Sequence, residues 1–149
     1  MKVEIFTLCD AATTDASGKL NILGSFDRLW AQQMPAMIPL CALAIKIRFY
    51  QIEEGTKRIR ISFMNVDGHL IMPRLDAQMQ IRSMPNETSA TAQMVMVIPQ
   101  LKLPNFGDYS IELAVDEIQA ASCPLSVRQP PLVPPLQQPP LPQPPLQQP

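Results

Sequence analysis

Side chains that could carry out catalysis are few in this sequence. His69 is the only histidine, and it follows the turn sequence Asp67-Gly68, so we expect it to be exposed to solvent. A Ser-His-Asp or Cys-His catalytic site would have to use this residue. The five glycines are scattered singly, and neither a G-x-S-x-G nor an H-E-x-x-H motif occurs. The sequence therefore predicts a protein that is not an enzyme and needs no cofactor, with a cryptic enzyme as a low-ranked alternative.

Metal-binding patterns are equally sparse. The three cysteines, Cys9, Cys41 and Cys123, form no C-x-x-C pair, and we interpret them as small buried hydrophobic residues in a reducing compartment. Together with one histidine they do not suit zinc. A calcium site is a weaker possibility, since six aspartates lie at or near expected loops, but turn formation explains them better. These aspartates are Asp10, Asp15, Asp27, Asp67, Asp108 and Asp116.

Four basic residues form the first candidate binding surface. Each alternates with apolar residues in an expected strand, two in residues 41–52 and two in residues 57–66. They are Lys46, Arg48, Arg58 and Arg60. We expect all four to point away from the protein core on one face.

The join between these two strands, Glu53-Glu54-Gly55, suits a three-residue hairpin loop. Such a hairpin places Phe49 near Ile59, and Arg48 opposite Arg60. Like charges directly opposite one another are unfavourable. The arginines would then need a nearby carboxylate, such as Glu112, or an acidic protein partner. An ordinary solvated face, balanced by acidic residues, is the alternative.

The last 21 residues form the second candidate. They contain 10 of the 17 prolines and no charged residue, whereas all 12 basic and all 13 acidic residues lie in 1–128. A chain of this composition cannot build a core, and its prolines favour an extended polyproline II helix. We therefore expect a folded domain over residues 1–128 and a disordered, proline-rich tail over residues 129–149.

Two patterns in this region match ligands of proline-recognising domains. The spacing of Arg128, Pro131 and Pro134 matches the R-x-x-P-x-x-P pattern of SH3 ligands, and Pro139-Pro140-Leu141-Pro142 matches a PPLP ligand of WW domains. An adaptor role for the tail is thus one hypothesis. A low-complexity spacer without a binding role is the alternative.

The overall charge and hydropathy exclude several function classes. The net charge of −1 argues against a general nucleic-acid binder or a polybasic membrane anchor. The N-terminus does not resemble a signal peptide, and no apolar run approaches the ~20 residues of a membrane-spanning helix. We therefore expect a cytoplasmic protein.

The expected elements are almost entirely β-strands. Strand patterns occur in residues 2–10, 19–31, 41–52, 57–66, 75–83, 88–98 and 105–128. The first of these has apolar residues on both faces, which predicts a strand partly covered on both sides or lying near a sheet edge that is later covered. No segment longer than about ten residues keeps a helical period. Gly24 predicts a bulge or bend in the second of these strands, and Trp30 at its end is expected in the core or at its edge. Together they predict an antiparallel β-sandwich of seven or eight strands.

The best-defined stretch, residues 105–128, contains a turn motif, a strand, a tight reversal and a second strand. Asn105, Gly107 and Tyr109 match the tyrosine corner of immunoglobulin-like sandwiches, in which the tyrosine hydroxyl bonds back to the upstream backbone. Ile111 stands where antibody domains place a disulfide cysteine. The reversal at 116–117 pairs the two strands, and a bulge near 121–122 would reconcile their apolar faces. This stretch predicts an immunoglobulin-like fold without the inter-sheet disulfide.

Three segments resemble a family of small bacterial proteins that is catalogued only as a domain of unknown function. They are MKVEIFTLCDAA at the N-terminus, LNILGSFDRLW from residue 20, and FGDYSIELAVD from residue 106. The resemblance covers residues 1–128 and implies a β-sandwich with no known activity or functional residues. The leading hypothesis is a protein-interaction or structural module. The alternatives are an adaptor that works through its tail and, ranked low, a metal-dependent binder. The oligomeric state stays open.

Overall fold

The computed structural model describes residues 1–131, which form nine strands and one short 3-10 turn. The strands are β1 (Lys2–Thr14), β2 (Leu20–Ser25), β3 (Arg28–Trp30), β4 (Ala36–Tyr50), β5 (Gly55–Asn65), β6 (Leu75–Ile81), β7 (Ser89–Leu103), β8 (Gly107–Val115) and β9 (Ile118–Arg128), and the 3-10 turn is η1 (Gln51–Glu53). No α-helix occurs in residues 1–131, so none there crosses a membrane. The tail was expected to be disordered over residues 129–149. Most of it, residues 132–149, lies outside the described residues.

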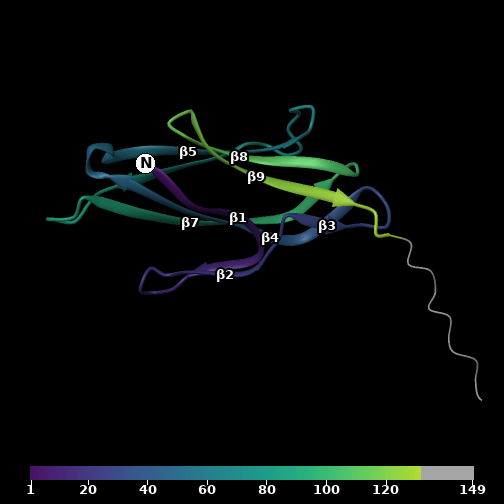
Figure 1. The fold of residues 1–149 in the computed structure, drawn as a ribbon, viewed down its shortest axis with the longest axis horizontal. Helices are drawn as coiled ribbons and strands as arrows, with labels where there is room; N and C mark the ends of the chain where they lie inside the picture. The colour runs from purple at the N-terminus through teal and green to yellow at the C-terminus, as the bar shows by residue number, and fades with distance from the viewer. Residues whose placement is uncertain (132–149) are drawn as a thin grey trace, which may run out of the picture.

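The strands form two sheets that pack face to face (Figure 1). The first sheet has the order β2-β1-β4-β7, and the second has the order β3-β9-β8-β5-β6. Neighbouring strands are antiparallel except β3, which runs parallel to β9. The structure confirms the all-β class and the two sheets.

The core lies between the sheets and is built from alternate residues of each strand. Phe49 of β4 and Phe63 of β5 are its largest fully buried side chains. The faces predicted to be inward in the strands that became β5, β6, β7 and β8 all contact this core. Complete burial of such a side chain contributes roughly 1.5–3 kcal/mol, so the alternation of these strands stabilises the packing of the two sheets.

The predicted hairpin of residues 41–66 is wrong. β4 lies in the first sheet and β5 in the second, and η1 carries the chain from one to the other. Phe49 pairs with Ala90 of β7, and Ile59 pairs with Ala77 and Val115. The odd-numbered residues of both strands are buried as expected, because they point at one another across the core rather than along one sheet.

The expected strand over residues 19–31 divides into β2 and β3, which join different sheets, so the structure has nine strands. Gly24 provides the predicted bend, with a φ of 64°. A Cβ there would meet the carboxylate of Asp10, an exposed side chain that can move aside, so the positive φ is the main reason for glycine at this position. Trp30 was expected in the core or at its edge, but it is 55% exposed, and the Arg28 guanidinium lies 5.9 Å from the ring centroid. The change of sheet after Ser25 altered which residues face inward.

The hairpin of β1 and β2 folds back over the outer face of the first sheet, as Figure 1 shows. Apolar side chains of the hairpin pack there against buried small residues in a second, smaller cluster. The buried members are Cys9, Ala42 and Ala44, and the hairpin contributes Ala12, Leu20 and Ile22. The first sheet is therefore partly covered on both faces.

The tyrosine corner is present. The hydroxyl of Tyr109 donates to the carbonyl oxygen of Asn105 at 2.7 Å and accepts from the Asn105 N–H at 3.1 Å. Gly107 between them has a φ of 140°, which only glycine adopts readily. Tyr109 is buried, so these bonds satisfy its hydroxyl inside the protein.

The reversal between β8 and β9 is the predicted two-residue turn. Val115 pairs with Ile118, and both Asp116 and Glu117 have positive φ values, as such a turn requires. The expected bulge is present but lies nearer the turn than predicted, because the register shifts between Leu113 and Ala114.

Candidate interaction surfaces

The four predicted basic residues do not form one face. Lys46 and Arg48 lie on the solvent side of the first sheet, and Arg58 and Arg60 on the solvent side of the second. The prediction that Arg48 lies opposite Arg60 is wrong. Arg48 pairs with Lys2 and Thr91, and Arg60 pairs with Asp76 and Ala114. The two pairs of cations must therefore be considered separately.

On the first sheet, Glu4 lies between the two cations. Its carboxylate is 2.6 Å from Nε of Arg48 and 3.3 Å from Nζ of Lys46, and Arg48 also donates to the hydroxyl of Ser89. The hydrogen bond from Arg48 lowers the pKa of Glu4 below its ordinary value. One carboxylate thus neutralises part of the charge of two cations.

Glu4 reaches this position because β1 is irregular there. The register between β1 and β4 shifts between Val3 and Ile5, so Glu4 is the extra residue of a bulge. From the sequence we expected Glu112 to be this carboxylate. Glu112 is occupied elsewhere, by Ser110, Gln119 and Ser122. No pattern in the sequence pointed to Glu4, because the bulge that places it depends on the pairing of β1 with β4.

On the second sheet, each cation has its own carboxylate. Nε of Arg60 lies 3.0 Å from Asp76, and Nζ of Lys57 lies 3.0 Å from Asp116. Asp116 also accepts the backbone N–H of Arg58 at 2.9 Å, and this bond is the main reason that its pKa is lowered. The turn between β8 and β9 is thereby tied to β5.

Among the cations that form salt bridges in residues 1–131, Arg58 is the most loosely paired. Its Nη1 is 3.5 Å from Oε1 of Glu117, the longest salt bridge in residues 1–131, and the two side chains are 53% and 66% exposed. Two adjoining hollows of about 300 Å³ each share Arg58 and Gln78. Glu117 borders one hollow and Asp76 the other, so this part of the surface is uneven and carries both signs of charge.

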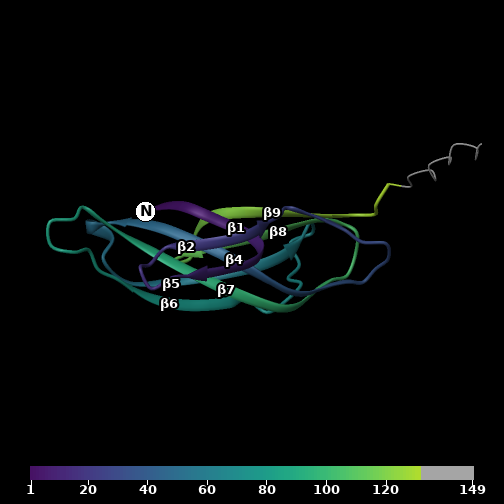
Figure 2. The same cartoon turned by 90° about the horizontal axis from the view of Figure 1, so that it is seen from below.

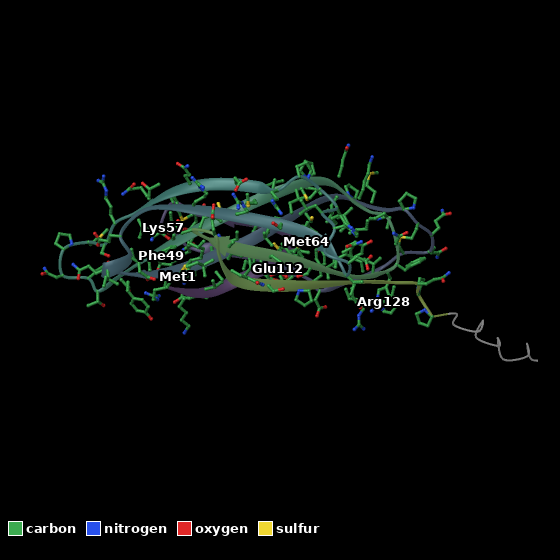
Figure 3. The ribbon with its side chains drawn as sticks, turned by 90° about the horizontal axis from the view of Figure 1, so that it is seen from above. Met1, Phe49, Lys57, Met64, Glu112 and Arg128 are labelled. Carbon is green, nitrogen blue, oxygen red and sulfur yellow. The ribbon has the colours of Figure 1, made fainter. Side chains whose placement is uncertain are left out.

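Arg128, the first residue of the predicted SH3-ligand pattern, is the last residue of β9. Its Nη2 lies 2.6 Å from Oδ1 of Asp108, and the residue pairs with Trp30 of β3. The Ser126 hydroxyl and Arg128 together lower the pKa of Asp108. Figure 3 shows Arg128 at the end of the molecule where the described chain stops, far from Lys57. Arg128 would have to leave this ion pair to act in an extended ligand.

The other residues of the tail patterns follow β9. Pro131 is exposed. Pro134, Pro139 and Pro142 lie outside the described residues, so the two ligand patterns stay predictions.

The three cysteines are buried, as predicted, and none forms a disulfide. Burial raises the pKa of Cys41 to about 11, and it also raises the pKa of Cys9 and Cys123. A raised pKa keeps a thiol protonated at neutral pH, and the protonated form is a poor nucleophile. The cysteines therefore contribute to packing, as small hydrophobic residues do.

His69 and the loop aspartates have local structural roles. His69 is exposed, as predicted, after a turn in which Oδ1 of Asn65 accepts the N–H groups of Asp67 and His69. Asp15 likewise accepts the N–H groups of Ser17 and Lys19. Within residues 1–131, no three His, Cys, Asp or Glu side chains are close enough to hold a metal ion.

A model of a known protein family matches most of the chain. The Family of unknown function (DUF6941) matches residues 4–128. This match confirms the resemblance found in the sequence, and it ends at the last residue of β9. No curated protein and no solved structure matches the chain.

Proposed function

We propose that this chain, which belongs to the Family of unknown function (DUF6941), is a non-enzymatic protein-interaction module. Its binding surface is the solvent face of β5 and β6 around Arg58, and its partner presents a carboxylate there. The scaffold is an immunoglobulin-like sandwich, a proposal supported by the bonds between Tyr109 and Asn105.

The observation that carries this proposal is the open ion pair of Arg58. A salt bridge between exposed side chains contributes only about 0–1 kcal/mol, because water screens both charges. At 3.5 Å from Glu117, and more than half exposed, Arg58 can exchange its partner at little cost. A guanidinium binds a carboxylate through two parallel hydrogen bonds, which provides a directional contact for an incoming protein.

The surroundings of Arg58 favour a segment of polypeptide as the occupant. The two hollows on either side of the arginine are shallow, and Thr56 and Gln78 offer neutral hydrogen-bonding groups in them. Arg60, which lines one of the hollows, is held by Asp76 at 3.0 Å and would guide an acidic segment without having to move. An acidic segment lying across β5 and β6 would contact all of these groups.

The test compares partners captured from the protein's own cells by the full-length chain and by two variants. Arg58→Glu reverses the charge at the proposed surface. Lys19→Glu makes the same change of charge at an exposed residue of the β1–β2 loop, and it serves as the matched control. A protein captured by the wild type and by the control but lost with Arg58→Glu is the expected result.

Two outcomes contradict the proposal. One is a partner that Arg58→Glu captures as well as the wild type does, and the other is the absence of any protein enriched by the wild type. Circular dichroism of the variants checks that neither change unfolds the domain, so a loss of capture reports on the surface.

The adaptor role of the proline-rich segment and a cytoplasmic location stay predictions. For the adaptor, the ion pair between Arg128 and Asp108 competes with the SH3-ligand pattern. Deletion of residues 129–149 separates the two hypotheses, because only the adaptor loses its partner.

A further inference from the structure

The two sheets end in four edge strands, and these differ in how they are protected. β2 and β7 are the edges of the first sheet, and β3 and β6 are the edges of the second. An edge strand presents backbone N–H and C=O groups that lack a partner, so proteins usually shorten, charge or cover such strands. The comparison shows which edge could accept a further strand.

Three of the edge strands have features that protect against pairing with another chain. β3 has only three residues and begins with Arg28. β6 has seven residues and contains Asp76, with Arg74 before it and Arg82 after it. β2 has six residues and is bent over the first sheet at Gly24. Each of these features hinders pairing with another chain.

β7 lacks this protection. It is a strand of 15 residues, and Lys102 near its end is its only charged residue. Its backbone pairs with β4 along one side, and no other strand of residues 1–131 pairs with it. Pro99 and the positive φ of Gln100 interrupt the edge only near its end. The segment from Ser89 to Ile98 is therefore long, uncharged and open.

Two apolar side chains at or next to this edge are exposed to solvent. Val97 of β7 is 61% exposed, and Leu40 of the adjacent β4 is 57% exposed. They lie on the same outer face, because Val97 pairs with Ala42 and Leu40 pairs with Pro99, two residues further along each strand. A strand added to β7 would cover part of the exposed surface of Val97.

We propose that β7 pairs antiparallel with β7 of a second copy of this chain, so that the first sheet runs continuously through a two-fold dimer. The charges at the strand ends favour this occupant. Glu87 lies two residues before β7 and Lys102 lies near its end, and both are exposed. An antiparallel two-fold arrangement brings Glu87 of each copy towards Lys102 of the other.

β6 provides the contrast. Figure 2 shows β6 and β7 along the same side of the molecule. If β6 paired antiparallel with β6 of a second copy, Arg74 of one copy would approach Arg82 of the other. These two positive charges would repel one another. Of these two edges, β7 is complementary to itself and β6 is not. Because the proposed contact is made by β7 and not by the face around Arg58, it goes beyond the proposed function.

The side-chain alternation limits the register of the dimer. A two-fold axis perpendicular to the sheet keeps the inner faces of both copies on one side, so residues of equal parity must pair. An axis near Met94 or Val95 satisfies this condition and uses the segment before Pro99. Val97 then lies beside Thr91 or Gln93 of the other copy, where its exposed surface is covered.

The first test measures the molar mass of the full-length chain over a wide range of protein concentrations by analytical ultracentrifugation. A dimer that dissociates on dilution is expected, and a monomer at every concentration overturns the proposal. Val97→Lys is expected to shift the protein to the monomer. Ile118→Lys, at a residue 70% exposed on β9, is the matched control and leaves the dimer intact. A dimer that Val97→Lys does not affect uses another surface, which also overturns the proposal.

The second test reverses the end charges. Glu87→Lys and Lys102→Glu should each weaken the dimer by about tenfold, because each turns two symmetric attractions into repulsions. Mixing the two variants should restore association, since every end then meets an opposite charge. A mixture that associates no better than either variant alone contradicts the antiparallel pairing. Arg58→Glu should leave the dimer unchanged, so failure of this proposal is distinguishable from failure of the proposed function.

Discussion

The solvent faces of the two sheets carry the same sequence pattern but differ in how firmly their cations are held. On the first sheet, Glu4 lies between Lys46 and Arg48 and is 2.6 Å from Arg48. On the second, Arg58 reaches Glu117 only at 3.5 Å. The alternation of cations with apolar residues is similar in both strands. The neighbouring strand decides whether a cation supports the fold or is available to a partner.

Both faces lie over the same core, so replacing a large core side chain should lower the stability of the protein more than any change on a face. Phe49 lies under the first face and Phe63 under the second, and each is 1% exposed. Replacing either with alanine leaves a cavity and should lower the free energy of unfolding by about 3–5 kcal/mol. Urea denaturation should show one transition in both variants. Two separate transitions would mean that the sheets unfold independently, so that no single free energy of unfolding describes both faces.

The corner at Tyr109 gives the next effect. Tyr109→Phe removes both bonds to Asn105 and leaves the ring in place, so the free energy of unfolding should fall by about 1–2 kcal/mol. Tyr109 belongs to the second sheet. Amide hydrogen exchange in β4 of the first sheet and β5 of the second measures whether both sheets lose stability in this variant. Faster exchange in β5 alone would contradict a single cooperative unit.

Glu4→Gln tests the tightly paired face. It leaves Lys46 and Arg48 without their carboxylate, so the melting temperature at neutral pH should fall. Because Arg48 lowers the pKa of Glu4 in the folded state, the stabilisation is complete above the ordinary pKa of 4.5 and disappears as the pH falls through the lower folded value. Melting curves against pH should therefore converge for wild type and variant in acid. A difference that persists there would show that the carboxylate's charge is not the cause.

Glu117→Gln tests the loosely paired face and should have the smallest effect. A change at an exposed site with a long ion pair should alter the free energy of unfolding by less than about 0.5 kcal/mol. Thermal denaturation of Glu117→Gln and Glu4→Gln in the same buffer compares the stability that each face loses with its carboxylate. A loss at Glu117 as large as that at Glu4 would contradict the view that Arg58 exchanges its partner at little cost.

Local sequence patterns predicted several features correctly. The period of two placed Ile59, Ile61 and Phe63 in the core, and the spacing of Asn105 and Tyr109 predicted the corner. Each rests on interactions between residues a few positions apart, or on the geometry of a single strand. The candidate surface was predicted only in part, because its residues face solvent as expected but divide between two sheets.

The sequence by itself determined which side of most strands is buried and where the chain makes its tight turns, because backbone geometry and hydrophobicity act locally. Only the tertiary structure decided which strands are neighbours: it separated Arg48 from Arg60, brought Glu4 to Arg48 and exposed Trp30. The alternation of buried and exposed side chains along a strand is the same whichever strand lies beside it. The choice among partners depends on contacts between residues far apart in the chain, such as the 44 positions that separate Glu4 from Arg48.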